Sequence, residues 1–196
     1  MLDRALAAWR ECEPALDLRP VTVDLNAGRE ALAAVLDTLG QPNATAFVAL
    51  DEQHLNFNRL ALLEALEERG LPMPPLVGPG VLASTGVVLG ENCWIGPGAM
   101  LQHGCAIGRN AVVGAGVIVG AGACVGQSSW LDDGVVIGRD AKVGAHVTLG
   151  LGVLVGRGVR VADHCVIDRP GRIEKDVPGR TFLHASHDGP IFIVGQ

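Results

Sequence analysis

The chain has 196 residues, which is enough for one domain or for one domain with a small appendage. Its composition is 48% hydrophobic and only 18% charged, and its 27 glycines occur without the G-X-Y period of collagen. The formal net charge is −6, and the first 75 residues, with twelve acidic and six basic side chains, account for all of it. Nothing supplies a broad basic footprint, so a nucleic-acid partner is not expected.

The cellular compartment is indicated by the N-terminus and by the cysteines. The opening stretch MLDRALAAWRECEP carries acids among its apolar residues and is not expected to be a signal peptide. Five cysteines, an odd number without C-x-x-C spacing, indicate a reduced, cytoplasmic protein. The uncharged run 111–131 is long enough to suggest a membrane span, but its five glycines and six-residue period argue against one. No membrane partner is expected.

Residues 1–75 are expected to form a small α/β domain. VTVDL (21–25) and TAFVALD (45–51) have the pattern of strands, whereas GREALAAVLDTL (28–39) and NRLALLEALEERG (58–70) have that of helices. This alternation predicts a short parallel sheet. The stretch after the first strand, NAGRE, has one glycine in place of a G-x-G-x-x-G turn, so these residues do not predict a phosphate cradle.

A six-residue repeat fills residues 76–171. Every sixth position is aliphatic, with one alanine among the sixteen, and glycine usually follows it. The sixteen positions are Val77, Ala83, Leu89, Ile95, Leu101, Ile107, Val113, Val119, Val125, Leu131, Ile137, Val143, Leu149, Val155, Val161 and Ile167. Such a fixed period predicts a solenoid, and we interpret it as a left-handed parallel β-helix of about five coils with eighteen residues per coil. A small or branched residue lies three places after the glycine position of each hexad. These residues, including Cys93, Cys105 and Cys165, are expected to point into the core. A tail, 172–196, follows.

The position before each aliphatic residue is expected to face outward and to form three columns. Two columns are apolar, and the third becomes polar toward its end. They are Leu82, Met100, Ile118, Val136 and Leu154; Trp94, Val112, Trp130, Thr148 and Val166; and Val88, Ala106, Cys124, Lys142 and Arg160. Two exposed apolar columns are too large a patch for a lone soluble subunit, so we expect a homotrimer of parallel prisms that buries them. The alternative is that the N-terminal region covers one of them.

The chain resembles the hexapeptide-repeat sugar acetyltransferases of the sialic acid O-acetyltransferase and bacillosamine-pathway N-acetyltransferase type. The resemblance covers roughly residues 45–168 and is most specific at FVALDEQHLNFNRLALLEALEERGLPMPPLVGPGVLASTGVVLGENCWIGPGAM, which is similar to the junction between nucleotide-sugar domain and β-helix in that family. It implies transfer of an acyl group from acetyl-CoA to an amine or hydroxyl of a sugar or nucleotide-sugar in surface-polysaccharide synthesis. It also implies trimers that bind acetyl-CoA between adjacent β-helices, and a histidine that deprotonates the acceptor.

The sequence departs from the family at its histidines. The family histidine lies in an E-H-D-C type hexad, where this chain has Ala121, and a second one aligns with Trp130. His103, in MLQHGCAIG, has the same place within its hexad one coil earlier, and we name it as the candidate catalytic base. The alternative for His103 is a solvent-facing residue without a role in catalysis.

Two further groups are candidates for ligand binding. Asp132 and Asp133 interrupt a column of glycines and could hold a sugar hydroxyl or amine, although a solvated turn is the alternative. Cations gather from residue 157 onward, and coenzyme A carries phosphates that need cations. The candidate cofactor-binding residues are Arg157, Arg160, Arg172 and Lys175, and ordinary surface charge is the alternative.

The remaining histidines do not indicate a metal site. His146 and His164 are eighteen residues apart and are expected to stack on one face below Asn92, Asn110 and Ser128, without a third ligand for a metal. His184 and His187 lie in the tail, as part of a flexible or packing segment. No metal cofactor is expected, which disfavours a metal-dependent hydratase. A catalytically silent relative that serves as a trimeric scaffold or binding module is the alternative to an acyltransferase.

Overall fold

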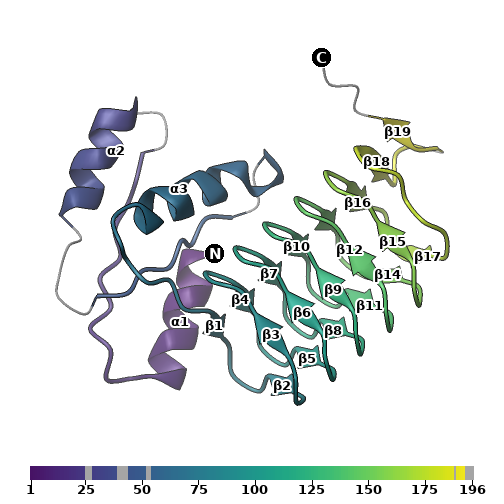
Figure 1. Cartoon of the computed structure of the whole chain (residues 1–196), viewed down its shortest axis with the longest axis horizontal. Coiled ribbons are helices and arrows are strands. Elements are labelled where there is room, and N and C mark those ends of the chain that lie inside the picture. The colour runs from purple at the N-terminus through teal and green to yellow at the C-terminus, as the bar shows by residue number, and fades with distance from the viewer. Residues whose placement is uncertain (25–27, 39–43, 52–53, 188, 193–196) are drawn as a thin grey trace.

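The protein is described by a computed structural model over residues 1–24, 28–38, 44–51, 54–187 and 189–192, and a parallel β-helix makes up most of it (Figure 1). Its strands belong to three sheets, and each third strand from β1 to β17 returns to the same sheet, whereas β18 and β19 both extend the first sheet. Sheet A has the order β1-β4-β7-β10-β13-β16-β18-β19, sheet B the order β17-β14-β11-β8-β5-β2, and sheet C the order β15-β12-β9-β6-β3.

The strands of the β-helix are short, and most contain two residues. Sheet A contains β1 (Leu76–Val77), β4 (Trp94–Ile95), β7 (Val112–Val113), β10 (Trp130–Leu131), β13 (Thr148–Leu149), β16 (Val166–Asp168), β18 (Thr181–His184) and β19 (Ile191–Phe192). Sheet B contains β2 (Leu82–Ala83), β5 (Met100–Leu101), β8 (Ile118–Val119), β11 (Val136–Ile137), β14 (Val153–Val155) and β17 (Gly171–Ile173). Sheet C contains β3 (Val88–Leu89), β6 (Ala106–Ile107), β9 (Cys124–Val125), β12 (Lys142–Val143) and β15 (Arg160–Val161).

The register confirms the eighteen-residue coil. Met100 pairs with Ile118, and Ile118 pairs with Val136, all in parallel strands. The predicted left-handed parallel β-helix is therefore the fold of the chain. The β-helix has about six coils rather than the expected five, because β17 and β18 continue sheets B and A beyond the last hexad of the sequence.

Aliphatic and small side chains fill the interior of the prism as the repeat predicts. Leu101, Ile137 and Leu149 are almost completely buried, and so are the three cysteines expected to point inward. Burial raises the pKa of the Cys93 thiol to about 12, because an apolar interior disfavours the thiolate. The three inward cysteines, Cys93, Cys105 and Cys165, therefore act as small core hydrophobes.

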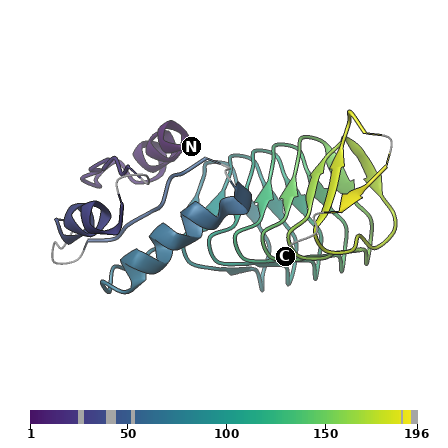
Figure 2. The same cartoon turned by 90° about the horizontal axis from the view of Figure 1, so that it is seen from above.

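The N-terminal region consists of helices at the N-terminal end of the prism, and the one coloured dark blue lies furthest from the coils (Figure 2). The helices are α1 (Leu2–Cys12), α2 (Gly28–Asp37), the 3₁₀ turn η1 (His54–Asn56) and α3 (Phe57–Glu67). α2 and α3 confirm the two predicted helices, whereas α1 was not predicted. Within the described residues, none of the helices is long and apolar enough to cross a membrane.

The two strands predicted for the N-terminal region are wrong. Residues 21–24 and 45–51 belong to no strand, and residue 25 lies outside the described residues. In the second segment, the Val48 amide donates to the side-chain oxygen of Asn92 at 2.8 Å, and the Val48 carbonyl accepts from Arg59 at 3.0 Å. Side chains thus satisfy backbone groups that a neighbouring strand would otherwise bind.

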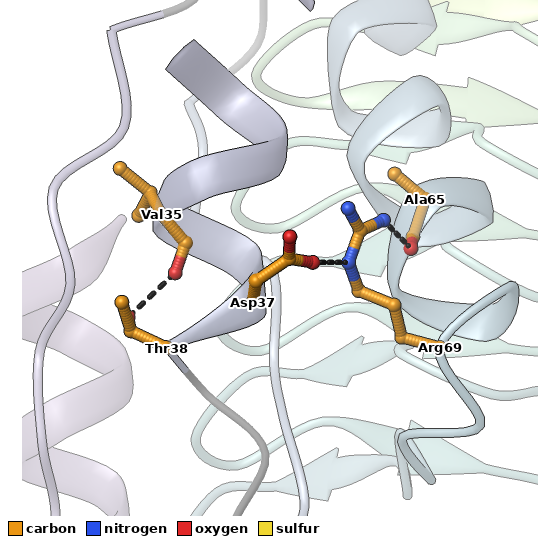
Figure 3. A network of polar contacts seen from close by, with 5 residues as sticks. All are labelled: Val35, Asp37, Thr38, Ala65 and Arg69. Carbon is orange, nitrogen blue, oxygen red and sulfur yellow. Dashed lines mark hydrogen bonds and ion pairs between the residues drawn. The ribbon is translucent and has the colours of Figure 1, made fainter. Parts of the chain in front are cut away.

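α2 is joined to the end of α3 by a small polar network (Figure 3). Arg69 pairs with Asp37 at 3.0 Å and also donates to the carbonyl of Ala65 at 2.9 Å. The Thr38 hydroxyl donates to the Val35 carbonyl at 2.6 Å, at the end of α2. An apolar cluster that includes Leu36 and Leu63 lies between the helices. The polar contacts therefore border a small core that is separate from that of the prism.

The N-terminal region covers one of the two apolar outward columns. Ala5 and Ala8 of α1 pack with Trp94 and Val112 of sheet A, and this cluster also includes Phe47. Trp94 and Val112 are consequently buried without any partner subunit. The expectation that an oligomer buries both columns is wrong for this part of sheet A. The alternative, that the N-terminal region covers one of the columns, is correct there. The column on sheet B remains open, with Leu82 65% and Leu154 39% exposed.

Candidate functional site

The turns between the sheets form three edges along the prism, and the candidate site residues lie on them. We call these the A–B edge, the B–C edge and the C–A edge, after the sheets that they connect. Residues eighteen apart stack along each edge, at the spacing of about 4.8 Å between paired strands. The edge to which a residue belongs therefore decides which other residues can share a ligand with it.

The B–C edge brings His103 into one column with several cations. The column contains one residue from each coil: Thr85, His103, Ala121, Arg139, Arg157 and Lys175. Arg139 lies two coils from His103 and Arg157 three, which corresponds to roughly 10 and 14 Å along the prism. Histidine and cations are exposed, so a ligand lying along this edge can contact both.

His103 contacts the coils on both sides of it. Its Nδ1 lies 3.1 Å from the hydroxyl of Thr85, and its backbone carbonyl accepts from the amide of Gly122 at 3.0 Å. A Cβ added to Gly86 would lie 3.5 Å from His103 Cε1, so the ring rests over a glycine. The neighbour of His103 on the next coil is the small residue Ala121, as the repeat predicts. Its backbone amide donates to Gln102 at 3.1 Å.

All four predicted cofactor-binding cations surround the C-terminal end of the B–C edge. Arg157 and Lys175 lie in the column itself, Arg160 lies on sheet C, and Arg172 lies on sheet B. Arg157 is 3.8 Å from Asp140, and Arg172 is 3.2 Å from Glu174, with both pairs largely in solvent. Exposed ion pairs of this kind contribute little to stability, so the cations remain available to an anionic ligand.

Asp132 and Asp133 lie on a different edge from His103. They form the A–B edge after β10, where Asp133 Oδ1 accepts from the amide of Ala115 at 2.8 Å and Asp132 Oδ1 accepts from the amide of Asp133 at 3.0 Å. Both side chains are half-buried. The width of sheet B separates this edge from the B–C edge, so one chain does not bring the two aspartates together with His103.

A groove between α1 and the A–B edge begins beside Asp133. Its volume is about 400 Å³, which is within the range of small-molecule sites. Apolar side chains form most of the walls, and one arginine and two carboxylates provide charge. The lining residues are Arg4, Ala7, Ala8, Glu11, Pro79, Trp94, Pro97, Ala115 and Asp133. Asp132 lines a second, smaller pocket, which shares Arg4, Trp94 and Asp133 with this groove.

The C–A edge carries the predicted ladder of polar residues. Asn92 donates to Asn110 at 2.9 Å, and Asn110 donates to Ser128 at 2.9 Å. The ladder continues with His146 and His164, whose rings are parallel with centroids 5.4 Å apart, as the spacing predicts. All five residues have positive φ angles at their turns. The ladder is therefore a structural element of this edge.

α3 closes the C–A edge through Arg59, which the sequence did not single out. Arg59 is 1% exposed and donates to the backbone carbonyls of Val48, Asn92 and Asn110. Burial lowers the pKa of Arg59 to about 9, while the three acceptors favour its charged form at neutral pH. The stacked rings of Phe57 and His146, with centroids 4.2 Å apart, extend this contact. The C–A edge is thus occupied by the chain itself from Asn92 to His146.

The histidines of the tail belong to the last coil. His184 ends β18, where its Nε2 lies 3.7 Å from Asp168 and its Nδ1 lies 2.6 Å from the hydroxyl of Ser186. This part of the tail packs onto sheet A, which agrees with the packing alternative. Among the residues that the structure describes, no three histidine, cysteine, aspartate or glutamate side chains are grouped so that they could hold a metal ion.

Sequence reasoning missed two residues near the candidate site. Arg139 follows His103 by 36 residues, so the eighteen-residue period could have placed it in the same column. Arg4 lines the groove only because α1 packs beside sheet A, and the hexad pattern carries no signal for that contact.

The repeat and the fold define the class of protein, a hexapeptide-repeat β-helix. Residues 86–121 match the family model described as bacterial transferase hexapeptide (six repeats), and residues 117–150 match that described as hexapeptide repeat of succinyl-transferase. Among curated proteins, none matches the chain significantly by sequence. The hexapeptide part of the resemblance is thereby confirmed.

Solved structures resemble the chain over most of its length. PerB from Caulobacter crescentus, in complex with CoA and GDP-perosamine, has a TM-score of 0.77 at 21% identity, covering 92% of this chain and 87% of that one. The acetyltransferase domain of PglB from Neisseria gonorrhoeae FA1090, in complex with acetyl coenzyme A, has a TM-score of 0.56 at 19% identity, covering 81% and 76%. These likenesses establish a shared fold.

Proposed function

We propose that this chain is an acetyl-CoA-dependent acyltransferase that acts on an amine or hydroxyl of a sugar or nucleotide-sugar in surface-polysaccharide synthesis. The observation that carries the proposal is the column on the B–C edge, where an exposed histidine is followed at coil spacing by Arg139, Arg157 and Lys175. The likeness to structures that contain CoA and GDP-perosamine or acetyl coenzyme A supports it.

The cations of the B–C edge can bind the phosphates of the acyl donor. Coenzyme A carries a diphosphate and a further phosphate, and arginine binds phosphate through two parallel hydrogen bonds. In the proposed arrangement, Arg139, Arg157 and Lys175 hold the phosphates along the edge, and Arg160 and Arg172 flank them. The thioester end then points toward His103.

His103 acts as the general base in this proposal. Its imidazole takes the proton from the acceptor amine or hydroxyl as that atom attacks the thioester carbonyl. Backbone amides of the turns stabilise the oxyanion of the tetrahedral intermediate. The intermediate then expels the CoA thiolate, which takes up the proton, and the acylated sugar leaves. Atoms and charge are conserved without a metal ion.

We further propose that three copies form a ring with sheet B toward the axis. The exposed side chains of Leu82, Met100 and Leu154 favour burial by a second copy. In such a ring, the A–B edge of one copy meets the B–C edge of the next. The groove beside Pro97, Ala115 and Asp133 would then face His103 of the neighbouring copy, with Asp132 and Asp133 binding the sugar.

Calorimetric titration with acetyl-CoA and with free CoA tests the proposal. Saturable binding with one site per chain, together with acyl transfer in a screen of amino-sugars and nucleotide-sugars, is the expected result. His103→Ala should abolish turnover and leave the oligomer intact, whereas His187→Ala, which changes an exposed histidine of the tail, should not affect turnover. Absence of binding at high ligand concentration would reject the acyltransferase.

A scaffold or binding module without catalytic activity is the second candidate. Ala121 and Trp130, at the positions of the histidines in the resembled family, favour it. The same titration separates the two functions, because a scaffold does not need acetyl-CoA. For either function, the five free cysteines support a reducing, cytoplasmic location.

A further inference from the structure

The contact between Thr85 and His103 joins two successive coils at the B–C edge. Thr85 follows β2 and His103 follows β5, eighteen residues later, and the Thr85 hydroxyl lies 3.1 Å from His103 Nδ1. The backbone reinforces this contact, because the amide of Gly104 donates to the Thr85 carbonyl at 3.3 Å. The ring therefore has a fixed neighbour although both side chains are exposed.

The chemistry of a neutral imidazole makes this contact important. One ring nitrogen carries the proton and the other holds the lone pair that can accept a proton. The Thr85 hydroxyl can either donate to Nδ1 or accept from Nδ1–H at this distance. Where it accepts from Nδ1–H, Nε2 is the basic nitrogen. Within the described part of the chain, the Thr85 hydroxyl is the hydrogen-bond partner of the His103 ring, through Nδ1, and no carboxylate forms an ion pair with it.

We propose that Thr85 is a positioning residue, which holds His103 in the Nδ1–H tautomer and leaves Nε2 free to take the proton of the acceptor. The role of His103 as base rests on the proposed function, whereas its tautomer is a property of the chain alone. Gly86 supports the same arrangement, since a side chain there would lie against the ring at Cε1. A threonine thus takes the place that a carboxylate partner has in many histidine bases.

The tautomer is measured first, by ¹⁵N NMR of the histidine ring nitrogens at a pH where His103 is neutral. His103→Gln identifies the signals of His103 in the wild-type spectrum. Nδ1 should be the protonated nitrogen in the wild type and in Thr85→Ser, which keeps the hydroxyl. Thr85→Val, which has the same shape without the hydroxyl, should shift the population toward Nε2–H. Ser84→Ala is the matched control, because Ser84 is an exposed hydroxyl residue of the same turn, and it should have no effect.

Turnover is measured next on the same variants. Thr85→Val should lower kcat by about fivefold, the effect expected for one neutral hydrogen bond, with KM for the acceptor unchanged. Thr85→Ser should restore kcat. A merely structural role of Thr85 would lower the thermal stability but would leave the tautomer and kcat of the folded protein as they are.

The outcomes separate this proposal from the proposed function. A wild-type His103 that is protonated at Nε2, or a tautomer that Thr85→Val does not change, would overturn the role of Thr85. If the tautomer behaves as expected but His103→Ala retains full turnover, the positioning contact holds and His103 is not the base.

Discussion

A hydrogen bond of 2.8 Å joins the guanidinium of Arg59, in α3, to the backbone carbonyl of Asn92 on the C–A edge. Arg59 reaches two further carbonyls, so one buried side chain connects α3, the segment around Val48 and two coils of the prism. The N-terminal region is thus attached to the β-helix by a charged residue and not only by apolar packing.

Replacing Arg59 by Met should lower the free energy of unfolding by about 3–5 kcal/mol, because three buried carbonyls lose their donor. Urea denaturation followed by tryptophan fluorescence measures the change, since Trp9 and Trp94 lie in the affected region. Arg69→Met is the control, because its partner Asp37 is exposed and such pairs contribute less than about 1 kcal/mol. Equal losses in the two variants would contradict the role of Arg59.

The cysteines should differ sharply in reactivity. Cys12 and Cys124 are exposed, whereas Cys93, Cys105 and Cys165 are buried. Burial raises the pKa of Cys93 to about 12, so at pH 8 almost none of it is thiolate. Iodoacetamide at pH 8 should label two thiols in the folded protein and five after unfolding, as counted by mass spectrometry. Rapid labelling of a buried cysteine in the folded chain would show that the inward positions are assigned incorrectly.

A charge on sheet B should prevent the proposed ring from forming. Met100 is 36% exposed in the single chain, and Met100→Glu would place a carboxylate in the interface. Light scattering should then give the 20.3 kDa mass of one chain instead of three times that mass. Lys142→Glu, an equivalent outward position on sheet C, should leave the oligomer unchanged. A wild-type protein that is monomeric at all concentrations would refute the ring.

The cations of the B–C edge should determine the affinity for coenzyme A. Arg157→Ala should weaken binding about five- to tenfold, which corresponds to about 1 kcal/mol or slightly more for one contact with a phosphate. Arg139→Ala should behave similarly, although only the structure identified this residue. Affinity for acetylpantetheine, which lacks the phosphates, should not change in either variant.

Arg180→Asn tests whether the position of the cation matters. Arg180 is an exposed arginine of the C–A edge with a positive φ angle, which asparagine tolerates. Its replacement removes the same charge from another edge, so CoA affinity should remain close to that of the wild type. If Arg180→Asn weakens binding as much as Arg157→Ala, general electrostatic attraction explains the effect and the column does not.

The sequence by itself determined the prism. An aliphatic residue at every sixth position indicates a solenoid with hexads as its units, so the hexads predicted the inward residues, the eighteen-residue register and the stacking of His146 on His164. The same register predicted that Ala121 lies next to His103. These relationships are local or strictly periodic, and they depend on no contact with the N-terminal region.

Only the tertiary structure decided how the N-terminal region packs on the prism. The segment 45–51 has the composition of a strand, but Asn92 and Arg59 bind its backbone groups, and such long-range side-chain contacts leave no periodic signal in the sequence. The packing of α1 on Trp94 likewise covers a column that composition alone left exposed, and it creates the groove beside Asp133. Which edge remains open to a ligand therefore depends on contacts between residues far apart in the chain.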